Sequence, residues 1–270
     1  MDKVKNRFDN EVLEWDNKYK KPPKSIIPKS IIDEEIRLRS NYFYNLALDL
    51  YKKKWKISVL EIWCWTWRNI SRIKSISNDI KAVWVDISEN MIKFCKEKYN
   101  NIDFYVLDIC NWFLEEQFDL IILPWVVWYL PNNKKAFENI SSMQKKWWIL
   151  SFTYWDKTSI PRIIREKFLN WPNYLVLNKT INFLRKILLK RKDIIKKWGN
   201  NSYFNLYDTK YIENLYKSNY KLIDSKNLCY SSWIFWKFSI FYSRVLNKVL
   251  FWKFSRLALT KILTLKKIDE

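Results

Sequence analysis

The ten residues LEIWCWTWRN, starting at Leu60, lie where ligand chemistry is expected, between an apolar strand-like run and a helical apolar pattern. A loop that leaves a strand and enters a helix presents free backbone N–H groups, with the positive end of the helix dipole behind them. Acidic residues, Asp86 and Asp108, end the next two strand-like runs. Because the carboxyl ends of parallel strands meet at one edge of a sheet, the loop and these carboxylates are expected to form one ligand site.

The composition of this loop is unusual, because a tight turn between a strand and a helix normally carries glycines rather than indoles. The chain holds 17 Trp and 1 Gly, whereas average usage would give roughly 19 glycines at this length. Our interpretation is that many of these tryptophans are glycines in the natural protein, encoded by a UGA codon that the organism reads as glycine. Trp15 and Trp112 lie in ordinary amphipathic surroundings and are candidates for genuine tryptophan. The alternative is a chain that is truly rich in tryptophan.

Four segments, taken in chain order, then identify a family. They read VLEIWCWTWRN, VWVDISENM from Val83, YVLDI from Tyr105, and FDLI from Phe118 with KKWWIL later. With glycine in place of tryptophan, they resemble the motifs of class I S-adenosylmethionine-dependent methyltransferases, including V-L-[DE]-x-G-x-G-x-G and G-V-D-x-S-x-x-M. A Rossmann dehydrogenase fits less well, because the G-x-G-x-x-G spacing does not match positions 63, 65 and 67.

The resemblance implies a role for each residue of the first loop. In the family this loop cradles the methionine moiety and the ribose of S-adenosylmethionine, which assigns Trp63, Cys64, Trp65 and Trp67 to the cofactor site. Glu61 would lie near the ammonium group of the cofactor. As written, the indoles would enter the space of the cofactor and penalise a left-handed turn. Cofactor binding by the family's mode therefore needs glycine in this loop.

The resemblance also assigns the residues after the second and third strands. Asp86 would accept hydrogen bonds from the two ribose hydroxyls. Asp108 would accept one from the adenine amino group, and Ile109 would supply a backbone N–H. Ile87 and Met91 would pack against the adenine. For each carboxylate the alternative is a solvated loop residue or a helix cap.

The alternation of strand-like and helical runs predicts a parallel sheet covered by helices on both faces. The expected strands are 57–62, 80–85, 102–107, 118–123, 149–154, 220–229 and 261–267, and the expected helices between the first five are 68–77, 88–99 and 133–144. With the resemblance, the fold class is α/β, a Rossmann-like doubly wound seven-stranded sheet whose last strand is antiparallel. The expected division is a helical N-terminal lid at 1–56, a cofactor-binding core at 57–155, a basic insertion at 156–205, and the rest of the core at 206–270 with a second insertion at 231–258.

No catalytic residue is identified, since transfer of a methyl group from a sulfonium leaves a neutral thioether and makes a general base optional. The chain has no histidine. Tyr129 is a candidate substrate contact after the fourth strand, with core packing as its alternative. Tyr19 resembles a lid tyrosine of small-molecule methyltransferases. The four widely spaced cysteines and the absence of histidine predict neither a metal site nor a disulfide framework, and fit the reducing cytoplasm.

The positive charge is concentrated in the second half, where residues 157–270 hold 24 Lys and Arg against 7 Asp and Glu. Such a surface favours an anionic partner: membrane headgroups, a phosphorylated substrate or nucleic acid. The basic, aromatic stretch 234–265 predicts an amphipathic element at an anionic membrane surface, with a lid over the substrate pocket as the alternative.

The substrate expected from the overall layout is a small molecule of the quinone, sugar or lipid-precursor kind. The sequence after the fourth strand, LPWV from Leu123, lacks the [DNS]-P-P-[YFW] motif of enzymes that methylate amino groups of nucleic acids. A nucleic-acid methyltransferase therefore rests on charge alone. If the tryptophans are genuine, the alternative is a degenerate, membrane-associated binding module. The expected location is the cytoplasm, with attachment to the inner face of the membrane left open.

Overall fold

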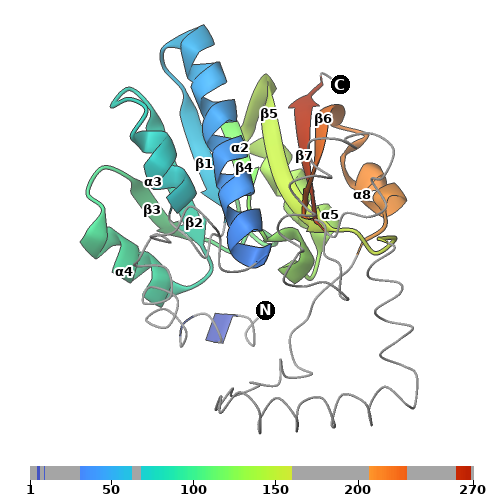
Figure 1. The fold of residues 1–270 in the computed structure, drawn as a ribbon. Helices are drawn as coiled ribbons and strands as arrows, with labels where there is room; N and C mark the ends of the chain where they lie inside the picture. Colours follow the sequence, from blue (N-terminus) through green and yellow to red (C-terminus); the bar gives the residue numbers. More distant parts are fainter. Residues whose placement is uncertain are drawn as a thin grey trace, which may run out of the picture.

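A computed structural model describes residues 5, 6, 9, 31–62, 68–159, 207–229 and 260–268 of the chain. They build a seven-stranded sheet in the order β3-β2-β1-β4-β5-β7-β6, with helices on both faces (Figure 1). The strands are β1 Ser58–Ile62, β2 Lys81–Asp86, β3 Asp103–Val106, β4 Phe118–Leu123, β5 Gln144–Trp155, β6 Tyr220–Cys229 and β7 Thr260–Lys267. The helices are α2 Ile31–Lys54, α3 Arg68–Lys74, α4 Glu89–Lys98, the 3-10 helix η1 Val127–Tyr129, α5 Asn133–Ser142 and α8 Thr209–Tyr216.

The strand directions confirm the predicted fold class. Strands β3, β2, β1, β4 and β5 pair in parallel, whereas β7 runs antiparallel to both of its neighbours, β5 and β6. This is the doubly wound, Rossmann-like sheet with an antiparallel last strand. Because parallel strands need crossover connections, α3 and α4 lie on the path from β1 to β2 and from β2 to β3.

Alternating side chains of each central strand build two apolar cores, one on each face of the sheet. In β1, Val59 packs with α2, α3 and α4, while the next residue, Leu60, packs on the opposite face with α5 and α8. Both side chains are fully buried, as is every residue of β4. Such continuous burial is typical of a parallel sheet covered on both faces.

Local capping sets where three of the helices begin. The hydroxyl of Ser88 accepts from the backbone N–H of Met91 at 3.1 Å and caps α4. The side chains of Asn132 and Asp208 cap α5 and α8 in the same way, through Lys135 N and Tyr211 N. Each of these helices thus begins at a residue whose side chain satisfies a free backbone N–H of the first turn.

The long helix α2 packs on the sheet, against α3 and β6 (Figure 1). Its side chains Phe43 and Ala47 are completely buried in the core on that face. The described part of the predicted N-terminal lid thus forms one layer of the domain. Most of the basic insertion 156–205 and the whole of the insertion 231–258 lie outside the described residues.

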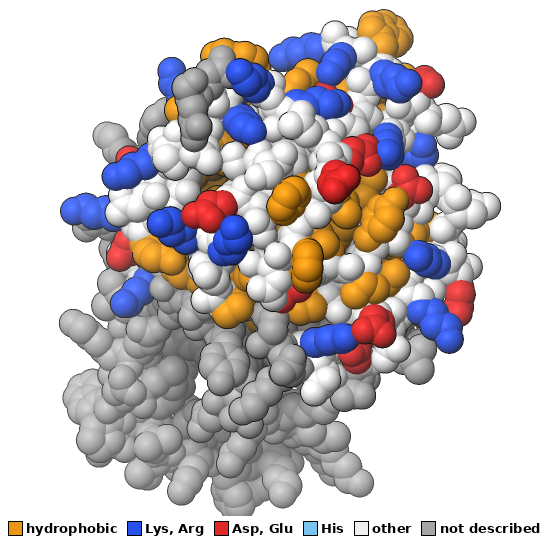
Figure 2. Space-filling view, turned by 180° about the vertical axis from the view of Figure 1, so that it is seen from behind, with side chains coloured by type: hydrophobic (Ala, Val, Ile, Leu, Met, Phe, Trp, Pro, Cys, Tyr) orange, Lys and Arg blue, Asp and Glu red, His pale blue; other side chains and the backbone are white. Residues whose placement is uncertain are grey.

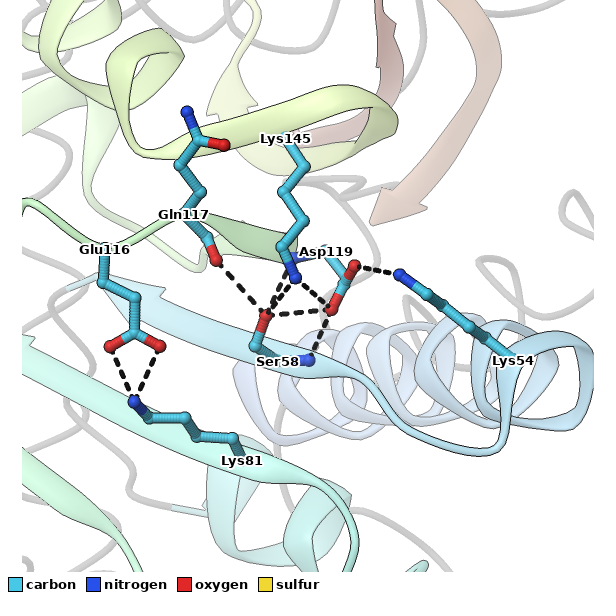
Figure 3. Close-up of polar contacts among 7 residues, drawn as sticks. All are labelled: Lys54, Ser58, Lys81, Glu116, Gln117, Asp119 and Lys145. Carbon is cyan, nitrogen blue, oxygen red and sulfur yellow. Dashed lines mark hydrogen bonds and ion pairs between the residues drawn. The ribbon is translucent and has the colours of Figure 1, made fainter.

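A polar cluster fastens the amino ends of β1 and β4, the edge of the sheet opposite the predicted ligand site (Figure 3). The buried Asp119 carboxylate accepts from the Ser58 backbone N–H at 2.7 Å and from the Ser58 hydroxyl at 2.9 Å. Lys54 and Lys145 pair with it at 2.9 and 3.0 Å. Burial alone would raise the pKa of Asp119, but these hydrogen bonds outweigh it and lower the pKa below its usual value. Both Asp119 oxygens are thus engaged within the cluster, which has a structural role: it holds β1 and β4 together.

We predict that Asp119→Asn destabilises the protein by about 1–3 kcal/mol at neutral pH, the cost of weakening hydrogen bonds to a charged, buried acceptor. Since the folded-state pKa lies below the unfolded value, this contribution is present above the unfolded pKa and is lost as the pH falls through the folded one. Urea unfolding at pH 7 and at pH 3 measures both effects. Glu116→Gln is the control, because the exposed pair of Lys81 and Glu116 should contribute less than about 1 kcal/mol. Equal losses for both variants would contradict a structural role for the Asp119 cluster.

Candidate active site

The strand order reverses between β1 and β4, and open α/β sheets bind ligands at such a switch point, outside the carboxyl ends of the strands. In Figure 1 these ends form the lower edge of the sheet. Ile62, Asp86 and Val106 end β1, β2 and β3 on this edge. The pairing of Ile62 with Val85 and of Asp86 with Val106 brings these ends side by side. The sheet therefore brings together the strand ends that carry or precede Glu61, Asp86 and Asp108, three of the predicted cofactor residues.

Asp86 is the buried polar group at the centre of this edge, with 2% of its surface exposed. One of its carboxylate oxygens accepts from the backbone N–H of Ser88 at 2.8 Å. Burial raises the pKa of Asp86 to about 8, and the nearby carboxylate of Asp9 raises it as well. Without a ligand, the carboxyl group of Asp86 is therefore mostly protonated at neutral pH.

Residues near the N-terminus lie against the start of α4, beside Asp86. The carboxylate of Asp9 accepts a hydrogen bond from the Ser88 hydroxyl, and its backbone carbonyl accepts from the Asn90 side chain at 3.3 Å. Lys5 pairs with Glu89 at 2.6 Å. Sequence reasoning missed Asp9, because nothing in its polar surroundings marks a residue that meets a strand end 77 positions away.

Glu61 joins β1 to α3. Its two completely buried oxygens accept from the Asn69 side chain and from the backbone N–H of Ile70, both at 2.8 Å. These bonds hold together the two ends of the predicted cofactor loop, and the approach of Glu61 to the cofactor ammonium stays a prediction. The loop itself, with Trp63, Cys64, Trp65 and Trp67, lies outside the described residues, and so does Tyr19.

Asp108 lies two residues beyond β3 and is partly exposed. Its oxygens accept from Cys110 N at 3.0 Å and from the Asn111 side chain at 2.7 Å, so the carboxylate shapes the turn that follows β3. Ile109 is buried, and its carbonyl accepts from Asn139 at 2.8 Å. The carboxylate thus lies at this edge of the sheet and is partly exposed.

The predicted apolar contacts are buried around these carboxylates. Ile87 follows Asp86 directly, and Met91 occupies the first turn of α4. Tyr129, in η1, is 6% exposed and packs against the ring of Trp128 at 6.0 Å between centroids. Burial of Tyr129 favours the packing alternative over direct substrate contact. Among the described residues, no group of three or more His, Cys, Asp or Glu is placed to hold a metal ion.

Comparison with known proteins identifies the domain that carries this edge. A family model described as "Methyltransferase domain" matches residues 56–218. The chain belongs to this methyltransferase family. The cofactor of the domain is S-adenosylmethionine, as the motifs of the sequence predicted.

A curated relative and two solved structures are similar to this methyltransferase chain. "Putative methyltransferase 235L" of Invertebrate iridescent virus 6 is 34% identical over 92 residues, which span 33% of either chain. Magnesium protoporphyrin IX methyltransferase of Synechocystis, solved with bound S-adenosylhomocysteine, has a TM-score of 0.57 at 12% identity, covering 97% of both chains. The N-methyltransferase NodS of Bradyrhizobium japonicum, solved with the same ligand, has a TM-score of 0.53 at 12% identity, covering 96% of this chain and all of NodS. These structures share the fold.

The residues at the edge fit the cofactor by their chemistry. Each carboxylate oxygen can accept two hydrogen bonds, so an ionised Asp86 can receive two neighbouring ribose hydroxyls in addition to Ser88 N–H. A second acceptor, Asp108, stands at the next strand end. The cofactor carries a cationic sulfonium and a cationic ammonium group, which favour the ionised form of a buried carboxylate.

We therefore predict that cofactor affinity depends on pH through Asp86, in a chain that carries glycine at positions 63, 65 and 67. The raised pKa means that binding must first ionise Asp86, so affinity should rise up to about tenfold per pH unit between pH 6 and 8 and level off above 8. Calorimetry in buffers of different ionisation enthalpy should detect proton release at pH 7. Asp86→Ala should weaken binding by roughly 1–3 kcal/mol and remove the slope.

Asp9→Asn is the control for this prediction. It removes the neighbouring negative charge that raises the pKa of Asp86, so the rise in affinity should move to lower pH while binding persists. A flat pH profile in the parent chain, or unchanged affinity in Asp86→Ala, would remove Asp86 from the cofactor site.

Proposed function

We propose that this protein transfers the methyl group of S-adenosylmethionine to a small-molecule acceptor, of the quinone, sugar or lipid-precursor type. The observation that carries this proposal is the buried Asp86 carboxylate at the switch-point edge of a methyltransferase-family sheet. The cofactor supplies an electrophilic methyl group with a neutral leaving thioether. The protein's own tasks are to bind, to orient and to exclude water.

In the chain as written, the turn after β4 packs against α2 and β7 at the proposed acceptor side of the edge. The loop after β4 lies against the first turns of α2, where the indole N–H of Trp125 donates to Glu35 at 2.5 Å. Glu35 also accepts a hydrogen bond from the hydroxyl of Thr260, the first residue of β7, at 3.1 Å. Helix α2 and strand β7 thus close around the end of β4. The magnesium protoporphyrin IX methyltransferase of similar fold acts, by its name, on a small molecule.

A nucleic-acid substrate is the second candidate, favoured by the net charge of +21. On the face of the molecule shown in Figure 2, Lys and Arg side chains are interspersed with Asp and Glu, so that face presents no uniform positive field. The remaining basic stretches belong mostly to residues outside the described ranges. The net positive charge of the chain is therefore the one observation that supports a nucleic-acid substrate.

The membrane-surface prediction concerns 234–265, of which only the last residues are described. Residues 260–265 belong to β7, inside the sheet, and the preceding part lies outside the described residues. No helix in the described ranges is long and apolar enough to cross a bilayer. Attachment to an anionic membrane and the cytoplasmic location stay predictions. The match to the methyltransferase domain favours an enzyme over a non-catalytic binding module.

Methyl transfer can be tested without knowing the acceptor. The chain with glycine at 63, 65, 67 and 125, which lacks the indole that lies against Glu35, is incubated with methyl-labelled S-adenosylmethionine and with separated small-molecule, lipid and nucleic-acid fractions of the native organism. We expect label in the small-molecule or lipid fraction, reduced about 5- to 150-fold in Asp86→Ala at subsaturating cofactor, because roughly 1–3 kcal/mol of binding free energy is lost. Label in nucleic acid alone would favour the second candidate. No label in any fraction would contradict the proposal.

A further inference from the structure

Three described residues other than glycine have a left-handed backbone, and all three are tryptophan. The φ angles are 62° at Trp55, 56° at Trp125 and 68° at Trp147. Positive φ is rare for residues with a Cβ and is mostly found at asparagine and aspartate, while a bulky side chain there is a true outlier. No asparagine or aspartate of the described ranges adopts it. The three left-handed positions, where glycine is expected on steric grounds, are therefore all occupied by tryptophan.

Each of the three sites has a local reason to need a left-handed residue. Trp55 directly follows α2 and donates its N–H to the carbonyl of Tyr51, the position where helices commonly end on glycine. Trp147 lies in the irregular start of β5, where the pairing with β4 jumps from Gln144 to Ile149. Bulges of this kind are also glycine sites.

Trp125 lies in the turn that leaves β4, where its N–H donates to the Thr153 hydroxyl at 2.9 Å. Two other tryptophans fit poorly for a different reason. The indole N–H groups of Trp84 and Trp128 are buried with no acceptor among the described residues. A buried indole N–H normally has a partner, so these side chains also conflict with their surroundings.

We propose that the natural residue at positions 55, 125 and 147 is glycine, and that glycine at 125 makes room for the methyl acceptor against the carboxylate of Glu35. The second half of this proposal rests on the proposed methyltransferase function. The first half rests on the backbone alone and does not depend on it.

The surroundings of position 125 give the acceptor site its chemistry. The indole of Trp125 covers Glu35, a carboxylate 6% exposed, and lies 4.3 Å from the guanidinium of Arg39. Removing the indole takes away the donor to one Glu35 oxygen, which also lies 3.9 Å from Nη1 of Arg39, while Thr260 still donates to the other oxygen. Burial raises the pKa of Glu35, and Arg39 opposes that rise. Glu35 would then accept from a hydroxyl or amine of the acceptor.

The identity of the three residues is tested directly by peptide mass spectrometry of the protein isolated from its own organism, together with the codons of its gene. We expect glycine masses at positions 55, 125 and 147 and UGA codons. Tryptophan masses or UGG codons at these positions would overturn the proposal. This result does not depend on how any variant folds.

A matched pair of substitutions tests the steric argument in the chain as written. Trp55 and Trp112 are 72% and 70% exposed, but only Trp55 has positive φ. Both changes to glycine add the same freedom to the unfolded chain, so their difference reports the left-handed strain less the edge contact that the Trp55 ring makes with Tyr51 at 6.3 Å between centroids. We expect Trp55→Gly to melt roughly 2–8 °C above Trp112→Gly. Equal melting temperatures, or a lower one for Trp55→Gly, would overturn the argument from backbone strain.

The acceptor contact is tested in the chain with glycine at 63, 65, 67 and 125, using the labelled-methyl assay. Glu35→Gln should lower transfer at least tenfold and leave cofactor affinity unchanged by calorimetry. Glu34→Gln is the control on the same helix, because it changes a neighbouring carboxylate that pairs with Arg37 at 2.7 Å. Equal transfer by Glu35→Gln and the parent would overturn the role of Glu35. If the parent chain itself transfers no methyl group, the proposed function is overturned. The identity of the residues at 55, 125 and 147 is still decided by the peptide masses, and the strain at position 55 by the melting temperatures.

Discussion

The parallel pairing of β1 with β2 on one side and β4 on the other is the constraint on which the rest of the structure depends. It aligns Leu60 with both Val83 and Ile121, so the three strands end at one edge. Because the chain then winds in opposite directions from β1, that edge is the switch point at which such sheets bind ligands. At this edge Glu61 ties β1 to α3, and Asp86 is a buried carboxylate. A clamp at the opposite edge, centred on Asp119, holds the same strands.

A second constraint comes from the backbone at the turns. The helix end at 55, the exit from β4 at 125 and the irregular start of β5 at 147 all require positive φ, whichever side chain is attached. The apolar pattern of the strands and the caps of the helices agree with one fold, while the tryptophans conflict with it locally. Such a conflict between local and global preferences is uncommon in natural sequences. Glycine at these positions removes the conflict.

The sequence predicted most of the sheet, because buried parallel strands are continuous apolar runs. The predicted strands 118–123 and 220–229 match β4 and β6, and the antiparallel last strand is confirmed. The start of β5 was placed five residues late, because the irregular segment around Trp147 interrupts the apolar pattern. Asp9, Glu35 and Asp119 were missed, because their partners lie far away in the chain and no local motif marks them. Asp86 was found because its motif is local.

The account depends most on whether the edge binds S-adenosylmethionine once glycine replaces tryptophan in the first loop. Calorimetric titration of S-adenosylhomocysteine into two chains measures this: the chain as written, and the chain with glycine at positions 63, 65 and 67. The account predicts saturable one-to-one binding by the glycine chain and at least tenfold weaker binding by the chain as written, because indoles exclude the ligand from a close-approach loop. Equal affinity in the two chains, or no binding by either, would contradict it.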